Sequence, residues 1–192
     1  MPILLRNMFR LVTVLGGLLC LPHAAAASDE AWQIWQSDGV HALMRHAIAP
    51  GTGDPANFTF GDCTTQRNLD DTGRQQARQT GDRIREMGIE LTSILTSQWC
   101  RCVDTARLLD LGPVTEEPAL NSFFRNRSTE AVQTAEIKAK LASLQGNAKL
   151  LLVTHQVNIT ALTDIFPRSG EIILFRMSDD GRELDVLSRL MP

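Results

Sequence analysis

Short apolar runs alternate with longer amphipathic stretches along the chain, which predicts strands separated by helices. Strands are expected at residues 40–45, 91–96, 114–115, 149–154, 171–177 and 183–190. Helices are expected at residues 31–36, 69–87, 97–110, 129–144 and 158–165. The last two strands flank Asp179-Asp180-Gly181, which predicts a terminal hairpin. The alternation indicates one domain of the α/β class.

The first 27 residues differ in composition from the rest of the chain. Basic residues precede an apolar run at residues 11–21, and a run of alanines follows it. This order is typical of a secretory signal peptide, here cleaved after Ala26 or Ala27. The apolar run is too short to span a bilayer comfortably, so no stable membrane anchor is expected after cleavage. We therefore expect residues 28–192 to form a periplasmic or secreted domain.

Length and charge narrow the possible functions. The chain has 192 residues, of which 43% are hydrophobic and 21% charged, and its formal net charge is -3. A chain of this size can bury the core of a single globular domain. Its slight negative charge argues against a nucleic-acid partner, so any anion-binding site has to be local.

Cationic and imidazole side chains follow three of the expected strands. Arg45 and His46 end the first strand, Arg101 comes shortly after the second, and His155 directly follows residues 149–154. In open α/β sheets, ligands bind at the carboxyl ends of the strands. Arginine recognises phosphate through its planar guanidinium, and histidine can form a covalent intermediate. These residues predict a phosphate pocket that contains a nucleophile.

Three cysteines, Cys63, Cys100 and Cys102, remain in the expected mature domain. An oxidising compartment permits one disulfide and leaves one thiol. A ring closed between Cys100 and Cys102 would be strained, so we expect Cys63 to pair with one of these two. The cysteines lack the spacing of a metal site, and His41 and His46 should face opposite sides of their strand. No metal ion is therefore expected.

Four motifs, in order along the chain, resemble the histidine phosphatase superfamily with its phosphoglycerate-mutase-like fold. Arg45-His46-Ala47 is similar to the Arg-His-Gly signature, and Val153-Thr154-His155 to the strand that carries the second histidine. Residues 69–77 resemble the first helix of the family, and residues 97–106 match its second-arginine motif. The resemblance covers about residues 39–165. It implies a three-layer α/β/α sandwich with a mostly parallel central sheet.

The resemblance also implies a reaction and a role for each residue. His46 becomes phosphorylated, and water then hydrolyses the phosphohistidine. Arg45, Arg101 and His155 bind the transferring phosphoryl group. Phosphoryl transfer needs positioning and neutralisation of charge, which cationic side chains can supply without a metal or other cofactor.

The sequence departs from the family pattern at three positions. Ala47 replaces the glycine after the first histidine, and Gln156 stands where glycine commonly follows the second. Ser122 occupies the position at which many members carry a glutamate as general acid. Because an alkoxide leaving group needs a proton, the acid has to come from elsewhere.

The loop at residues 47–68 offers the nearest carboxylates, Asp54 and Asp62, with Glu116 and Glu117 as more distant candidates. Asp62 is favoured as the catalytic acid because a disulfide at the neighbouring Cys63 could hold its backbone.

Three further arginines are candidates for substrate binding. Arg67 is similar to an arginine that precedes the first helix in the phosphohistidine-phosphatase branch, although a solvated position is the alternative. Arg125 and Arg127 follow the aromatic pair Phe123-Phe124 and could hold a second phosphate or a sugar ring. The alternative for these two is an exposed basic loop over core aromatics.

Together, these features predict an exported, metal-independent phosphoric monoester hydrolase of the histidine acid phosphatase type. The leader, the Arg-His-Ala variant and the cysteines resemble small periplasmic members linked to lipopolysaccharide core heptose phosphate. The expected partner is therefore a phosphorylated small molecule or glycan. Two alternatives stay open: a phosphohistidine-protein phosphatase, and a phospho-ligand-binding module that has lost turnover.

Overall fold

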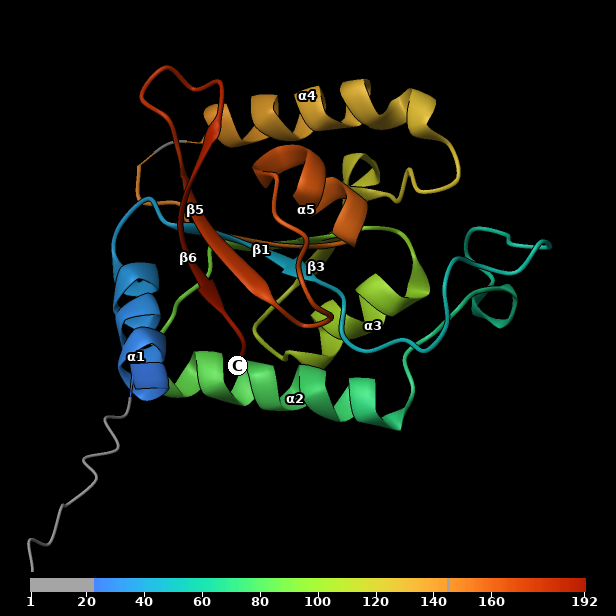
Figure 1. Cartoon of the computed structure of the whole chain (residues 1–192), viewed down its shortest axis with the longest axis horizontal. Coiled ribbons are helices and arrows are strands. Elements are labelled where there is room, and N and C mark those ends of the chain that lie inside the picture. Colours follow the sequence, from blue (N-terminus) through green and yellow to red (C-terminus); the bar gives the residue numbers. More distant parts are fainter. Residues whose placement is uncertain (1–22, 145) are drawn as a thin grey trace, which may run out of the picture.

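The computed structural model describes residues 23–144 and 146–192, and a six-stranded sheet forms the centre of this part of the chain (Figure 1). The strands are β1 (His41–Arg45), β2 (Ser93–Thr96), β3 (Val114–Glu116), β4 (Leu150–Thr154), β5 (Ile172–Met177) and β6 (Leu184–Leu190). They lie in the order β3-β2-β4-β1-β5-β6. The first four are parallel to one another, and β5 pairs antiparallel with both β1 and β6. The predicted parallel sheet and terminal hairpin are confirmed.

Helices cover both faces of the sheet. They are α1 (His23–Gln36), α2 (Asp71–Glu86), α3 (Cys100–Leu108), α4 (Glu130–Ala142) and α5 (Gln156–Thr163), with single 3-10 turns η1 (Cys63–Thr65), η2 (Pro118–Leu120) and η3 (Arg127–Thr129). Side chains of α1, α2 and α3 share one hydrophobic core with one face of the sheet, whereas α4 and α5 pack on the other face. This is the expected three-layer α/β/α sandwich.

The strand β4 shows why its sequence is apolar without a break. Leu151 and Val153 belong to the core under α1, α2 and α3, while Leu150 and Leu152 belong to the core under α4 and α5. Because successive side chains of a strand point to opposite faces, a central strand covered on both sides needs an apolar residue at every position.

The helix limits differ from those expected by one or two residues in most cases, and the starts of two helices differ by more. The first helix was expected at residue 31 but begins at His23, because an alanine-rich segment of high helix propensity extends it toward the N-terminus. The helix expected from Ser97 begins only at Cys100. The Ser97 amide donates instead to the carbonyl of Val153 and prolongs the pairing of β2 with β4.

The predicted leader lies mostly outside the described residues, so its cleavage stays a prediction. Within residues 23–144 and 146–192, no helix combines the length and the apolar character needed to cross a bilayer.

The segment after β1 is fixed against α2 by a close backbone contact. A Cβ atom at Gly73 would lie 1.9 Å from the carbonyl oxygen of Ile48, so only glycine fits at this point. Asp70 caps the helix by accepting a hydrogen bond from the Gly73 amide at 2.7 Å. The small residue at Gly73 therefore lets α2 approach the chain just beyond His46.

Candidate active site

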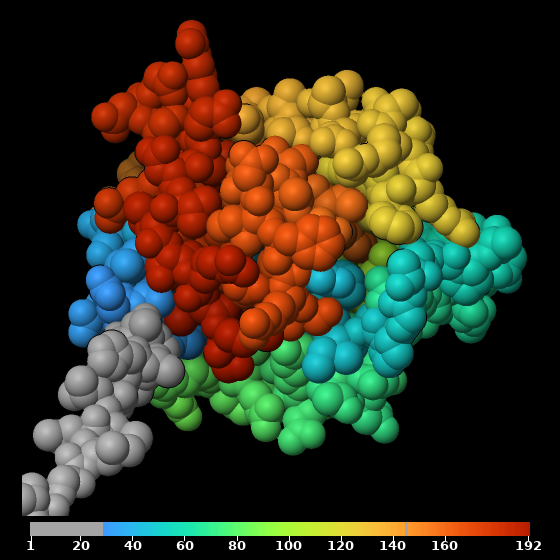
Figure 2. Space-filling view, in the orientation of Figure 1, coloured from blue at the N-terminus to red at the C-terminus, as the bar shows by residue number. Residues whose placement is uncertain are grey.

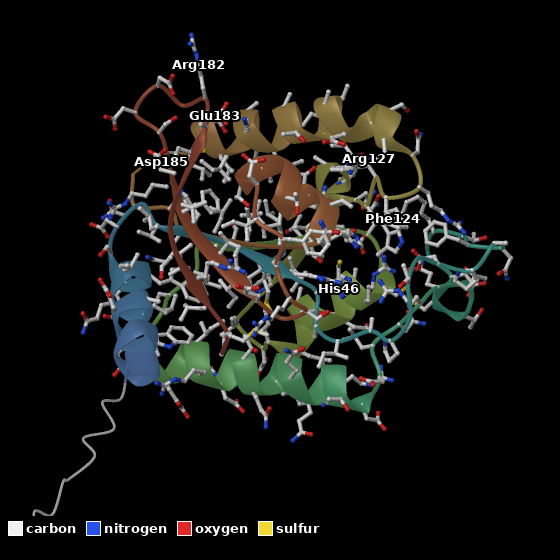
Figure 3. All side chains as sticks on the ribbon, viewed as in Figure 1. His46, Phe124, Arg127, Arg182, Glu183 and Asp185 are labelled. Atoms are coloured by element: carbon white, nitrogen blue, oxygen red, sulfur yellow. A yellow bond between two sulfur atoms is a disulfide. The ribbon has the colours of Figure 1, made fainter. Side chains whose placement is uncertain are left out.

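The structure brings Arg45, His46, Arg101 and His155 to the carboxyl edge of the parallel strands. Because β1, β4 and β2 are neighbours in the sheet, the segments that leave their carboxyl ends lie side by side. All four residues line one cavity of about 290 Å³. Figure 3 shows His46 near the centre of the molecule, below α5. Residues far apart in the sequence thus form one site.

His46 is 2% exposed, and its Nδ1 lies 2.8 Å from the carbonyl oxygen of Ala47. Since a carbonyl only accepts hydrogen bonds, Nδ1 carries the proton and Nε2 keeps its lone pair. Burial, with the nearby Arg101 charge, lowers the pKa of His46 to about 3. The imidazole is therefore neutral at physiological pH, as a nucleophile has to be. The hydrogen bond to the Ala47 carbonyl thus fixes the tautomer of the ring.

His155 is held in the opposite tautomer. Arg101 Nη2 lies 3.3 Å from its Nδ1, which therefore accepts, and its Nε2 lies 2.8 Å from Ser97 Oγ. Ser97 Oγ in turn donates to Asn121 Oδ1 at 3.1 Å. Burial and the Arg101 charge lower the pKa of His155 well below its usual value. Ser97 and Asn121, which sequence reasoning did not select, thus orient the second histidine.

Four guanidinium groups line the cavity: those of Arg45, Arg67, Arg101 and Arg125. The Nε atoms of Arg45 and Arg101 are buried without a hydrogen-bond partner among the described residues. Arg67 donates from Nε to the Gly53 carbonyl at 2.9 Å and from Nη1 to the carbonyl of Ala49. Burial and Arg101 lower the pKa of Arg67 to about 10, so it stays cationic at neutral pH.

Among the described residues, Asp54 is the carboxylate in the lining of this cavity, and its oxygens are hydrogen-bonded. Arg101 Nη1 lies 2.7 Å from its Oδ1, and Trp99 Nε1 lies 3.0 Å from its Oδ2. Burial acts to raise the pKa of Asp54, but the hydrogen bonds and charge of Arg101 outweigh it and hold the pKa below its usual value. An ionised carboxylate without a proton cannot act as the general acid.

Asp62, the favoured proton donor, does not line the cavity. It is exposed, and its carboxylate accepts hydrogen bonds from the amide and hydroxyl of Thr64 at the start of η1. The reason is local, since an aspartate two residues before a backbone amide readily caps a turn. Its position argues against the role of proton donor. Glu117 is occupied elsewhere by an ion pair with Lys140 at 2.7 Å.

Arg127 also lies outside the cavity, whereas Arg125 lies within its lining. The Arg127 guanidinium stacks over the Phe123 ring at 5.6 Å and pairs with Glu130 at 3.4 Å, at the start of α4 (Figure 3). Arg125 Nη2 instead donates to the Asp54 carbonyl at 2.8 Å. The alternative of an exposed basic residue over a core aromatic therefore describes Arg127.

The disulfide joins Cys63 to Cys100, with the Cα atoms 5.7 Å apart, and leaves Cys102 as a free, buried thiol. Cys102 Sγ lies 3.5 Å from Nε2 of His155. Burial raises the pKa of the Cys102 thiol to about 12, so it is neutral beside the imidazole. Of the two partners that the sequence leaves open for Cys63, the structure pairs it with Cys100.

Aromatic residues that sequence reasoning did not assign to the site surround the cavity. Trp99 packs edge to face on His155 with ring centroids 5.2 Å apart. Phe124 and Phe166 line the cavity and are 55% and 71% exposed. Trp99 could have been suspected because it lies inside the second-arginine motif. No sequence signal marks Phe166, which follows α5.

No group of three or more His, Cys, Asp or Glu among the described residues is arranged to hold a metal ion. The positive charge that these residues bring to the cavity is that of guanidinium groups.

Comparison with known proteins agrees with this geometry. The model of the histidine phosphatase superfamily (branch 1) matches residues 42–139, half of the chain, so the chain belongs to this superfamily. Membership supports a phosphatase. No curated protein sequence matches the chain.

Solved structures show the same fold at low sequence identity. The protein histidine phosphatase SixA complexed with tungstate shares 17% identity with a TM-score of 0.57, covering 80% of this chain and 97% of that chain. Phosphoserine phosphatase from Entamoeba histolytica in complex with 3-phosphoglyceric acid shares 15% identity with a TM-score of 0.55, covering 80% and 97%. A mycobacterial protein called hydrolase 1 shares 14% identity with a TM-score of 0.58, covering 79% and 97%. The phosphoglycerate-mutase-like fold is thereby confirmed.

Proposed function

We propose that the protein is an exported, metal-independent phosphatase that hydrolyses a phosphomonoester through a covalent phosphohistidine on His46. The observation that carries this proposal is the state of His46. Its Nδ1–H donates a hydrogen bond to the Ala47 carbonyl oxygen, so Nε2 of the neutral ring keeps its lone pair. The residue lines a cavity together with four arginines.

In the first step, Nε2 of His46 attacks phosphorus, and the bond between phosphorus and the leaving-group oxygen breaks as the nitrogen–phosphorus bond forms. The guanidinium groups of Arg45 and Arg101, with Arg67 beside them, offset the charge on the equatorial oxygens. Water then attacks phosphorus, the nitrogen–phosphorus bond breaks, and inorganic phosphate leaves with His46 restored.

The leaving group decides between two classes of substrate. Asp54 is ionised and holds Arg101, so the carboxylate in the cavity lining supplies no proton to an alkoxide. This observation favours a second candidate function, a phosphohistidine-protein phosphatase, because an imidazole leaving group depends less on a dedicated acid. A phosphomonoester would have to take its proton from water or from a group on the substrate itself.

Two further features support the finer parts of the proposal. The exposed rings of Phe124 and Phe166 at the cavity suit a substrate that carries a ring, such as a phosphorylated sugar of an envelope glycan. The Cys63–Cys100 disulfide is compatible with an oxidising compartment and hence with export.

The test is a panel of sugar phosphates, alkyl and aryl phosphates and a phosphohistidine peptide, assayed with and without EDTA. We expect turnover that EDTA does not change, and an acid-labile phosphoenzyme that can be trapped and detected by mass spectrometry. His46→Asn should abolish both, whereas Arg127→Ala, outside the cavity, should leave both unchanged. Near-normal activity of the His46 variant would refute the mechanism, and phosphate binding without turnover would indicate a binding module.

A further inference from the structure

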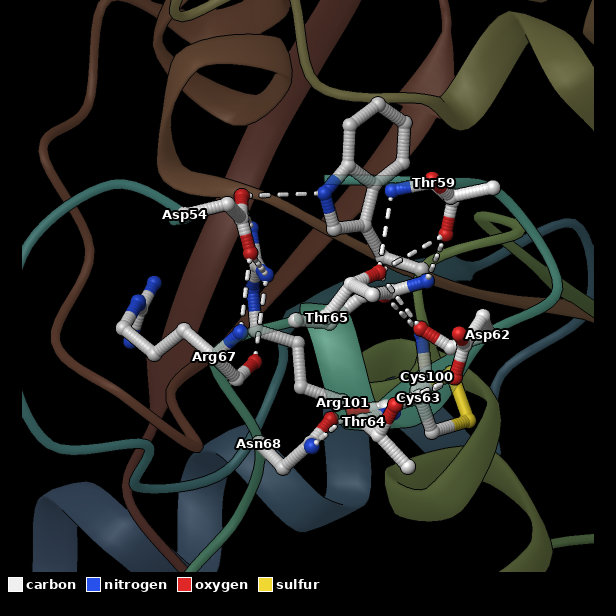
Figure 4. The surroundings of a disulfide bond; sticks show 12 residues. Asp54, Thr59, Asp62, Cys63, Thr64, Thr65, Arg67, Asn68, Cys100 and Arg101 are labelled. Carbon is white, nitrogen blue, oxygen red and sulfur yellow. Dashed lines mark hydrogen bonds and ion pairs between the residues drawn. A yellow bond between two sulfur atoms is a disulfide. The ribbon is translucent and has the colours of Figure 1, made fainter. Parts of the chain in front are cut away.

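Three consecutive residues at the start of α3 are all held by the loop at residues 47–68. Trp99 stacks on Phe58, with ring centroids 5.0 Å apart, and Cys100 is bonded to Cys63. Arg101 pairs with Asp54. The loop therefore contacts the start of α3 at three successive residues, of which Arg101 belongs to the site (Figure 4). In the space-filling view, this loop forms a lobe at one edge of the molecule (Figure 2).

The contact between Asp54 and Arg101 is a two-pronged ion pair. Nη1 of Arg101 lies 2.7 Å from Oδ1 and Nη2 lies 3.3 Å from Oδ2. The side chains are 3% and 8% exposed for Arg101 and Asp54 respectively, so water screens the pair little. A guanidinium held at both terminal nitrogens by a carboxylate has one orientation. The pair therefore also fixes the direction of the buried Arg101 Nε–H, which has no hydrogen-bond partner among the described residues.

Asp54 is itself fixed by two other donors. The Arg67 amide lies 3.1 Å from Oδ1, and Trp99 Nε1 lies 3.0 Å from Oδ2. Each carboxylate oxygen thus accepts two N–H groups. An asparagine would place its amide nitrogen against two donors whichever way it turned, so the isosteric change removes the charge and disrupts the geometry together.

The disulfide ties the same loop from its other end. Cys63 lies nine residues beyond Asp54, and beside the disulfide Gln66 Oε1 accepts from the Cys100 amide at 2.9 Å. Without the covalent bond, η1 and the residues before it would be held to α3 by noncovalent contacts alone. The loop would then sample positions in which Asp54 does not meet Arg101.

We propose that Asp54 is a positioning residue that sets the Arg101 guanidinium for phosphoryl transfer, and that the Cys63–Cys100 disulfide keeps Asp54 in place. Activity therefore depends on the oxidised state of this disulfide. The inference rests on the proposed function for its kinetic readout, while phosphate binding tests it independently of turnover.

The first arm compares Asp54→Asn with Asp71→Asn, an exposed carboxylate at the start of α2. We expect Asp54→Asn to lower kcat/KM by about tenfold to a hundredfold, as small misplacements of catalytic groups do. It should also raise the Kd for inorganic phosphate measured by calorimetry. Asp71→Asn should change neither quantity.

A double-mutant cycle separates positioning from a general structural effect. Lysine lacks the fork of arginine, so Arg101→Lys already breaks the two-pronged pair. In that background, Asp54→Asn should lower kcat/KM by no more than about twofold, the limit of additivity error. An equal loss in both backgrounds would overturn the proposal, as would an unchanged Kd for phosphate.

The second arm uses the unaltered protein. A dithiol such as dithiothreitol gives two electrons and two protons to the Cys63–Cys100 disulfide and becomes its own cyclic disulfide. We expect reduction to lower kcat/KM and reoxidation to restore it, while the Cys63→Ser/Cys100→Ser variant should have low activity that the dithiol does not change. Full activity after mass spectrometry has shown complete reduction would refute the role of the disulfide. If the wild-type protein has no turnover yet binds phosphate, the proposed function fails, and the Asp54 arm is still decided by Kd.

Discussion

The imidazole rings of His46 and His155 meet edge to face with their centroids 5.6 Å apart, and both are at least 97% buried. Each lies beside the Arg101 charge. Burial and this charge both disfavour a protonated imidazole, so the two rings are neutral together. One arginine thereby lowers the pKa of both histidines at once.

The first prediction concerns the titration of His46. Because its pKa is lowered to about 3, its ring signals in NMR spectra should not titrate between pH 8 and pH 5. An unperturbed histidine would titrate near pH 6.5 in that range. His46→Asn assigns the signals, and a midpoint near pH 6.5 for His46 would contradict the described burial.

The second prediction follows from the same shift and concerns stability. The unfolded chain binds a proton at His46 below about pH 6.5, whereas the folded chain does not until about pH 3, so the free energy of unfolding falls as the pH falls through this window. Each such histidine contributes a slope of up to about 1.4 kcal/mol per pH unit. Urea unfolding at pH 7, 6 and 5 should therefore show a shallower loss for His46→Asn than for wild type. Parallel slopes would show that His46 takes up its proton at the same pH in the folded protein as in the unfolded chain.

The third prediction concerns the leaving group. With Asp62 exposed and Asp54 ionised, the wild-type protein should hydrolyse p-nitrophenyl phosphate faster than an alkyl phosphate by about 10²-fold or more, the contribution of a missing general acid. Asp62→Asn should leave this ratio unchanged. A selective loss on the alkyl phosphate in steady-state assays would restore Asp62 as the proton donor.

The fourth prediction tests the close contact under the site. Gly73→Ala places a Cβ atom against the Ile48 carbonyl, so α2 or the chain beyond His46 must move. We expect the free energy of unfolding to fall by about 1–3 kcal/mol, the usual effect of overpacking. Gln75→Ala, at an exposed position of the same helix, is the control, and equal stabilities in urea would refute the contact.

The strands and the meeting of Arg45, Arg101 and His155 could be predicted because both depend on local signals: apolar runs, and arginine or histidine residues at or shortly after the ends of those runs. The position of Asp62 could not, since it is decided by which amide its carboxylate reaches within its own turn. The sequence offers Asp54 as a candidate acid, but only the folded chain shows that Arg101 stabilises its ionised form and that the carboxylate orients the Arg101 guanidinium. Such contacts join loop residues to partners far away in the sequence, and the hydrophobic periodicity of the chain carries no information about these pairings.

The place of β1 in the sheet has a consequence for how the protein is made. Although β1 is the first strand to be synthesised, its two neighbours, β4 and β5, both come from the last quarter of the chain. A ribosome must therefore release almost the whole polypeptide before β1, the strand that leads into His46, can be flanked on both sides. Pairing over such a sequence distance is slow, because the chain must first lose the entropy of closing a long loop. A nascent chain that stops before β4 lacks His155, which directly follows that strand, and so cannot form the histidine pair of the site.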